Sequence, residues 1–298
     1  MKCLLAGWFS FENMGASAGD LLARDLVCRW LTEEGLDYDI AVAAPFTDGI
    51  AWQQADPGDY AGVIFVCGPF GNGPPLTSGF LSRFSGLPMV GVNLSMLQNL
   101  QEWNPFDLLL ERDSSEAVRP DLVFLTEQPP VPVVGLILVH PQNEYGARGR
   151  HQQANEAAQR LIDSREMAVV PIDTRLDDNQ VGLRSAGEVE ALITRMDAVI
   201  TTRLHGMVMA IKNGVPPLVL DPIAGGAKIV RQAQAIDWPL TFLADEVSDE
   251  QLQAGLAFCL SPQGRAAASQ TRDRARDLLR DVRARFVAGI HELAHAGV

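Results

Sequence analysis

The sequence predicts an α/β protein built from two Rossmann-like domains that face each other across a cleft. Apolar runs of strand length alternate with helical patterns along almost all of the 298 residues. The apolar runs are continuous in Val, Ile and Leu, which is typical of parallel strands covered by helices on both faces. A proline-rich stretch, 127–134, interrupts this alternation, which then starts again.

The first half of the chain opens with the apolar run 2–9, followed by a loop that contains several glycines. A helix is expected over 20–34, because Leu22, Leu26 and Trp30 recur at helical spacing on one face. The further strands expected in this half are 38–44, 62–68, 87–95 and a run within 105–113.

The second half repeats the pattern after the proline-rich stretch, which places the two domains at 1–130 and 131–298. A helix opened by Ser185 carries Glu188 three residues later, which is the signature of a capping box. The last thirty or so residues predict one long amphipathic helix with a solvated face of Arg and Asp. The other elements expected here are strands in 133–141, 167–173, 197–201, 216–221 and 238–244, and helices in 150–164 and 248–260.

Composition and charge narrow the class of protein. A net charge of −13 and a pI of about 4.8 disfavour nucleic acid and anionic membranes as partners, since both require basic surface. No apolar run approaches the length of a membrane span, and the first residues lack the features of a signal peptide. The four cysteines are scattered without metal or redox spacing. We therefore expect a soluble cytoplasmic protein whose anionic ligands, if any, bind at positive charge concentrated in a cleft.

The loop after strand 197–201 concentrates such charge. It reads Thr-Thr-Arg-Leu-His-Gly and leads directly into a short helix, with Arg203 and His205 at the joint. A helix N-terminus carries unpaired N–H groups and partial positive charge, so it favours an anion, and Arg203 adds a fork of donors. Gly206 would let a ligand approach the backbone closely. The alternative is structural, with Arg203 paired to an acid such as Asp221 and His205 serving only as a cap.

The same segment resembles the hallmark of the polysaccharide pyruvyl transferase family. In that family a strand ends in Arg-Leu-His-Gly, and a small-residue helix, a Gly-Val-Pro turn, a strand and a later Lys follow. Here the lysine is Lys228. Three other segments are similar to the family in the expected order: an opening loop with Asn13 and Asp20, a Gly-rich loop in 63–73, and a segment with Arg112 and Ser115 that resembles the family's Arg-Asp-x-x-Ser element.

The first half also departs from the family pattern. Extra residues separate Gly15 from Asp20, the Gly-rich loop lacks three successive glycines, and the chain is short between residues 95 and 140. These differences concern the side where the family's acceptor would bind. Asp20, at the start of the first helix, can cap backbone amides of that helix or contact the acceptor.

The resemblance implies a glycosyltransferase-B-like fold and transfer of a pyruvyl group from phosphoenolpyruvate to saccharide hydroxyls. The C-terminal domain would then bind the donor, and the N-terminal domain would bind a saccharide or lipid-linked saccharide acceptor. Phosphoenolpyruvate carries a phosphate and a carboxylate, so it needs two anion sites. Arg203 with the helix N-terminus would provide one, and Lys228 with Arg112 the other.

His205 is the natural proton carrier, as a neutral base or as a hydrogen-bond donor to phosphate. His140, at the end of strand 133–141, is a secondary candidate. The argument requires no metal and no cofactor besides the donor, and no dinucleotide fingerprint or P-loop is present. Two alternatives stay open: a transferase of similar fold that uses a nucleotide sugar, and a non-catalytic protein that binds an anion. The sequence does not indicate an oligomeric state.

Overall fold

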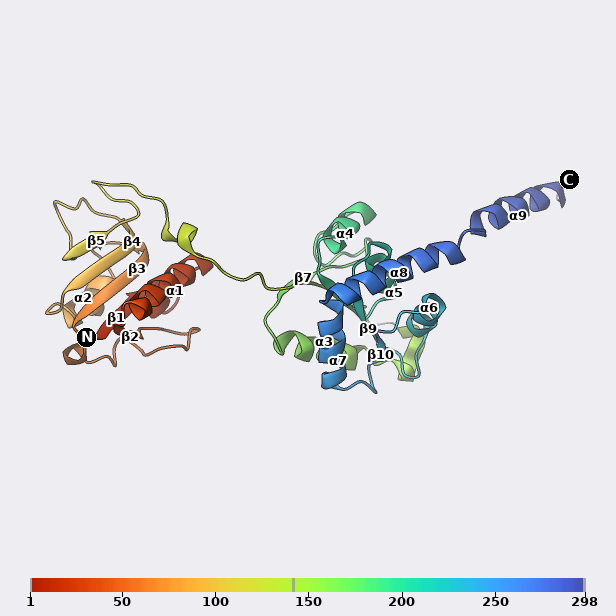
Figure 1. Cartoon of the computed structure of the whole chain (residues 1–298), viewed down its shortest axis with the longest axis horizontal. Coiled ribbons are helices and arrows are strands. Elements are labelled where there is room, and N and C mark those ends of the chain that lie inside the picture. The colour runs from red at the N-terminus through yellow and green to blue at the C-terminus, as the bar shows by residue number, and fades with distance from the viewer. Residues whose placement is uncertain (1, 141–142, 297–298) are drawn as a thin grey trace. The chain divides into compact units, whose positions relative to one another are not determined.

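The computed structural model describes residues 2–140 and 143–296 of the chain. The chain divides into two compact units, Met1–Pro129 and Pro130–Val298, and the division falls within the proline-rich stretch (Figure 1). Each unit contains its own parallel five-stranded sheet with helices packed against it. The prediction of two Rossmann-like α/β domains is therefore confirmed, and the cleft between them stays a prediction.

The sheet of the first unit has the order β2-β1-β3-β4-β5, with every pair of neighbours parallel. The fifth strand is shorter than the predicted run 105–113. The elements of this unit are β1 (Lys2–Gly7), α1 (Ala18–Glu33), β2 (Asp37–Ile40), β3 (Gly62–Phe70), α2 (Leu81–Arg83), β4 (Met89–Met96) and β5 (Leu108–Leu110).

Two apolar clusters hold this sheet. Helix α1 covers one face, where Val27 and Leu31 pack in one cluster with Leu5 and Val66 of the sheet. The other cluster is rich in aromatic rings, whose large apolar area compensates for the small helical content of this side. Its fully buried rings are those of Phe65, Phe70, Phe80 and Phe84.

The sheet of the second unit has the order β10-β9-β8-β6-β7 and is also parallel throughout. This is the doubly wound arrangement, in which the direction of the strand order changes between β6 and β8. The elements are β6 (Val133–Ile137), α3 (His151–Asp163), β7 (Ala168–Pro171), α4 (Ala186–Ile193), β8 (Ala198–Thr201), α5 (Leu204–Lys212), β9 (Pro217–Asp221), α6 (Lys228–Ile236), β10 (Thr241–Leu243) and α7 (Asp249–Cys259).

Helices cover both faces of this second sheet, as its continuous apolar strands predict. Helices α3 and α7 share one cluster with the strands, through residues such as Leu161 and Leu256. Helices α4, α5 and α6 belong to two further clusters, through residues such as Ile193, Met207 and Ile229. Helix α5 is thereby fixed at the carboxyl end of β8, where it positions the candidate site.

The predicted single C-terminal helix is wrong, because the structure has two helices, α8 (Pro262–Leu278) and α9 (Val282–Ala296). At the joint, the Leu279 and Arg280 N–H groups donate to carbonyl groups only three residues back. These hydrogen bonds span three residues in place of four, and the α-helical pattern ends there. The apolar spacing continues across the joint, so the sequence pattern did not mark the break. None of the helices in the described part of the chain combines the length and apolar character that crossing a membrane requires.

Candidate functional site

Three loops meet at the carboxyl edge of the second sheet. Strands β7, β6 and β8 are neighbours and run parallel, so the residues that follow them emerge at the same edge. His140 follows β6, Asp173 follows β7 and Arg203 follows β8. The topology thus brings together the two predicted residues His140 and Arg203 and adds a carboxylate between them.

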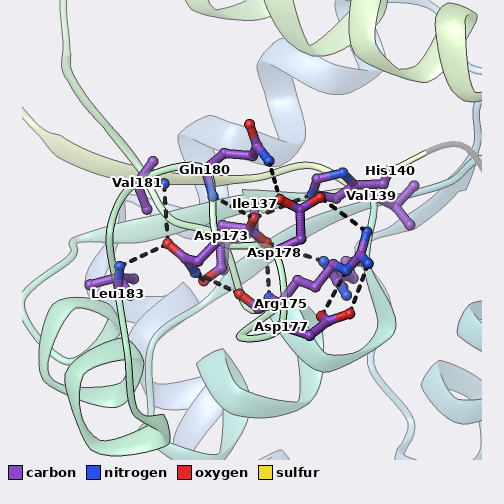
Figure 2. Close-up of polar contacts among 12 residues, drawn as sticks. Ile137, Val139, His140, Asp173, Arg175, Asp177, Asp178, Gln180, Val181 and Leu183 are labelled. Atoms are coloured by element: carbon purple, nitrogen blue, oxygen red, sulfur yellow. Dashed lines mark hydrogen bonds and ion pairs between the residues drawn. The ribbon is translucent and has the colours of Figure 1, made fainter.

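Asp173 is the centre of this cluster (Figure 2). One carboxylate oxygen accepts hydrogen bonds from Arg203 Nη1 at 3.3 Å and from the Arg175 N–H at 2.9 Å. The other oxygen lies 3.3 Å from His140 Nε2 and accepts from the Gln180 N–H at 3.2 Å. The Asp173 side chain is only 8% exposed, so the acid is buried with its hydrogen-bonding capacity used on both oxygens.

Burial alone would raise the pKa of the Asp173 carboxyl, because it disfavours the charged form. The hydrogen bonds from the Arg175 and Gln180 N–H groups, together with His140, outweigh burial and lower the pKa below its ordinary value. Asp173 is therefore an anion at neutral pH. It holds Arg203 and His140 at fixed positions on the two sides of its carboxylate.

The loop that carries Asp173 is ordered by its own side chains. The Asn179 amide donates to the Asp173 carbonyl at 3.0 Å, and its oxygen accepts from the Val181 and Leu183 N–H groups (Figure 2). Arg175 forms a bidentate pair with Asp177 at 2.8 Å for each bond. These bonds within the loop hold its conformation and keep Asp173 in place beside the strand ends.

The loop between β8 and α5 is held by two buried threonines. Thr201 Oγ1 donates to the Ile137 carbonyl at 2.9 Å and accepts from the Arg203 N–H at 3.0 Å. Thr202 Oγ1 accepts from the Val139 N–H at 2.8 Å. These bonds tie the start of α5 to the end of β6, so the backbone of Arg203 is rigid even though its side chain is 22% exposed.

Gly206 has a structural reason to be glycine. A Cβ atom at this position would lie 2.2 Å from Thr201 Oγ1 and 3.0 Å from Ile137 Cγ2. The missing side chain thus points at the strand ends beneath α5. The glycine therefore allows α5 to pack closely against the sheet. The expected close approach of a ligand is not supported, because the missing side chain of Gly206 faces the sheet.

A pocket of about 120 Å³ lies at the N-termini of α5 and α6. Arg203, His205 and Lys228 all line it, so three of the predicted residues share one site. Arg203 is the N-cap of α5 and its side chain does not cap the helix, which leaves first-turn N–H groups of α5 for a ligand. Lys228 is the first residue of α6. The pocket therefore combines two cationic side chains with the positive end of α5.

The structural alternative is confirmed in part: Arg203 does pair with an acid, but that acid is Asp173 and not Asp221. Asp221 is 1% exposed and accepts from the N–H groups of Ile223 at 3.1 Å, Ala227 at 2.9 Å and Val230 at 3.2 Å. It thus shapes the loop after β9 and the first turn of α6. This places Lys228 beside the pocket.

The predicted residues of the first unit have different surroundings. Asn13 is exposed and adopts a left-handed backbone conformation with φ of 57°. Asp20 accepts from the N–H and the hydroxyl of Ser17, both at 2.7 Å, and completes a capping box at the start of α1. Arg112 pairs with Asp121 at 2.8 Å, and this bond raises the pKa of its guanidinium. A joint site of Arg112 with Lys228 stays a prediction.

Asp173 is the functional candidate that the sequence reasoning missed. The signal was present in the sequence, because an acid at the end of the apolar run 167–173 lies at the binding edge of a parallel sheet. Nothing in the sequence places β7 beside β6, however, and that adjacency is what brings Asp173 to His140 and Arg203.

Residues 117–222 match the family model of polysaccharide pyruvyl transferases. The match includes His140, Asp173 and the Arg203–Gly206 segment, and it confirms the resemblance seen in the sequence. It supports a transferase that acts in polysaccharide modification. No curated protein sequence is significantly similar to this chain.

Several solved structures are similar at low TM-scores. Spinosyn forosaminyltransferase SpnP has 15% identity and a TM-score of 0.32, with 91% of this chain and 94% of that chain covered. Methanocaldococcus jannaschii UDP-GlcNAc 2-epimerase has 11% identity and a TM-score of 0.32, covering 94% and 100%. Acinetobacter baumannii MurG has 12% identity and a TM-score of 0.31, covering 91% and 94%.

Proposed function

We propose that this protein transfers the pyruvyl group of phosphoenolpyruvate to two hydroxyl groups of a saccharide, giving a pyruvate ketal and free phosphate. The observation that carries the proposal is the pocket in which Arg203, His205 and Lys228 meet at two helix N-termini. The match of residues 117–222 supports the same reaction class.

The donor has two anionic groups, and the pocket has two sets of cationic groups. The phosphate binds at Arg203 and the N-terminus of α5, where a guanidinium fork and backbone N–H groups both suit phosphate oxygens. The carboxylate binds at Lys228, the first residue of α6. Asp173 fixes one edge of the Arg203 guanidinium, so the remaining donors of the guanidinium stay available to the ligand.

The chemistry consists of one proton addition and two attacks at C2 of the donor. Protonation of the methylene carbon forms a methyl group, and the oxygen of the first hydroxyl bonds to C2. The oxygen of the second hydroxyl then bonds to C2 while the bond from C2 to the phosphate oxygen breaks. The two hydroxyl protons are balanced by the new methyl C–H bond and by the proton that leaves with the phosphate.

His205 is placed to move protons at the phosphate end of the donor. It is exposed, lies in the first turn of α5 and lines the pocket with Arg203. His205 acts as a base or as a hydrogen-bond donor to the phosphate. His140 is held by Asp173 at the same edge of the sheet and can carry the other proton.

The test is incubation of the protein with phosphoenolpyruvate and a panel of saccharides, with phosphate release and the ketal methyl signal in proton NMR as readouts. The proposal predicts release that depends on both the saccharide and Arg203, and loss of both signals in His205→Ala. Lys212→Ala is a matched control for Lys228→Ala, because Lys212 lies at the opposite end of α5 and pairs with Glu190. Transfer from a nucleotide sugar, with none from phosphoenolpyruvate, would contradict the proposal.

A further inference from the structure

The first unit has a pocket of its own at the carboxyl edge of its sheet. The pocket has a volume of about 480 Å³, within the range of small-molecule sites. It lies between the segment after β1, the segment after β2 and the segment after β3. Its lining residues include Phe11, Glu12, Phe46, Trp52, Gln53 and Gly79.

An aromatic wall forms one side of this pocket. The Trp52 ring lies 5.6 Å from Phe80 in an edge arrangement and 6.0 Å from Phe11 in a tilted one, measured between centroids. A Cβ atom at Gly79 would lie 3.0 Å from Trp52 Cη2, so a glycine lets the indole pack closely against this segment. Trp52 is partly buried, and its ring position is fixed before any ligand binds.

The loop that carries Trp52 is anchored to the rest of the unit. Ile50 exchanges backbone bonds with the end of β2, where its N–H donates to the Ile40 carbonyl at 2.9 Å and its carbonyl accepts from Val42 at 2.8 Å. The Arg83 guanidinium donates two bonds to the Ala55 carbonyl, at 3.0 and 2.6 Å. Hydrogen bonds therefore hold the loop on both sides of Trp52, and the pocket is preformed.

The polar groups of the pocket select the ligand class. Ser10 is already used, since its hydroxyl donates to the Ala41 carbonyl and accepts from the Gly7 N–H. Glu12 and Gln53 are exposed and supply an acceptor and an amide at the rim. The described lining residues contain a carboxylate and no lysine or arginine, so the pocket disfavours an anion such as phosphoenolpyruvate.

We propose that this pocket binds a neutral saccharide, with the apolar C–H face of a pyranose ring against Trp52 and its hydroxyls hydrogen-bonded to Glu12 and Gln53. An aromatic platform beside a carboxylate and an amide matches the two kinds of surface that a sugar ring presents. That the saccharide is the acceptor of pyruvyl transfer rests on the proposed function; that the pocket binds a saccharide does not.

The test is saccharide binding by ligand-observed NMR, with methyl glucoside, galactoside and mannoside as probes at concentrations that reveal weak binding. The proposal predicts binding of at least one probe, and affinity about tenfold lower in Trp52→Ala and in Glu12→Gln. Trp52→Phe should retain binding, because it keeps an aromatic face. Trp30→Ala and Glu102→Gln are the matched controls, since neither residue lines the pocket.

The outcomes separate this inference from the donor assignment. Trp52→Ala should leave phosphoenolpyruvate binding unchanged, and thermal unfolding of the first unit is measured beside it to show that the variant is folded, while Arg203→Ala should leave saccharide binding unchanged. No binding of any probe, or equal binding in wild type and Trp52→Ala, would overturn the saccharide site whatever the donor titration shows. Binding of tetramethylammonium in place of every sugar would identify a cation site and would overturn it too. Failure of phosphoenolpyruvate binding alone would leave the saccharide site standing.

Discussion

Arg203 and Asp173 form an ion pair of 3.3 Å across the ends of two strands that are not neighbours in the sheet. Strand β6 lies between β7 and β8, and the pair spans it, with His140 on the other carboxylate oxygen. The pair therefore connects three loops at the binding edge. It gives the proposed donor site a rigid wall before any ligand is present.

Replacement of Asp173 by Asn should destabilise the second unit. The neutral amide cannot serve all four donors that the carboxylate serves, and Arg203 and His140 lose their anionic partner. We expect the free energy of unfolding to fall by about 2 kcal/mol, measured by urea denaturation. Asp281→Asn is the matched control, because Asp281 is exposed in the same unit and forms only a surface pair with Arg285 at 3.7 Å, and it should unfold at the same urea concentration as the wild type. Equal unfolding of the Asp173 variant would contradict the described network.

The stabilisation from Asp173 should depend on pH in a defined direction. Hydrogen bonding lowers the pKa of its carboxyl in the folded protein below the ordinary value of 3.8. The contribution is therefore complete above that value and is lost as the pH falls through the folded pKa. The stability difference between wild type and Asp173→Asn should be constant near neutral pH and should shrink below about pH 4. A stability difference that grows as the pH falls would contradict the predicted direction of the pH dependence.

Gly206→Ala should be costly, although alanine normally favours a helix. Its Cβ atom would lie 2.2 Å from Thr201 Oγ1, and Thr201 is fully buried at the end of β8. We expect a loss of about 2 kcal/mol in the free energy of unfolding, together with weaker phosphoenolpyruvate binding, because Thr201 also holds the Arg203 N–H.

Gly187→Ala provides the matched comparison for this substitution. Gly187 lies in α4, and the nearest atom to its Cβ position is Ser185 Oγ at 3.9 Å. Alanine should stabilise the protein here by about 0.5 kcal/mol. Similar effects of the two substitutions would refute the packing explanation for Gly206.

Asp20→Ala distinguishes the two alternatives for this residue. The capping box with Ser17 predicts a loss of about 1 kcal/mol in the stability of the first unit, measured by thermal unfolding. Binding of phosphoenolpyruvate and of saccharides should be unchanged in the folded variant. Glu33→Ala, at the exposed last turn of the same helix, should cause no loss. Reduced saccharide binding without loss of stability would instead support an acceptor contact.

Most of the fold could be predicted from the sequence, because its strands and helix starts are specified by residues that are close together in the chain. Continuous Val, Ile and Leu runs predicted the parallel strands, and Ser185 with Glu188 predicted the start of a helix, where the Glu188 N–H does donate to the Ser185 hydroxyl. The joint of α8 and α9 escaped prediction because the apolar spacing of residues such as Leu279 and Val282 is the same with or without it.

The candidate site was predictable only in part. Arg203, His205 and Lys228 were found through their motif, and the structure places them around one pocket. The role of Asp173 depends on the order of the strands, which no local pattern specifies. The packing role of Gly206 depends on its distance to Thr201, which likewise appears only in three dimensions.

The most direct test of the donor site is calorimetric titration of phosphoenolpyruvate into the wild type, Arg203→Ala and Arg265→Ala. Arg265 is an exposed arginine of the same unit that pairs with Asp197 away from the pocket, so it controls for the loss of one positive charge. We predict dissociation constants in the micromolar to millimolar range for the wild type and Arg265→Ala, and no detectable binding for Arg203→Ala. Absence of binding to the folded wild type, with or without saccharide, or unchanged binding to Arg203→Ala, would contradict the assignment.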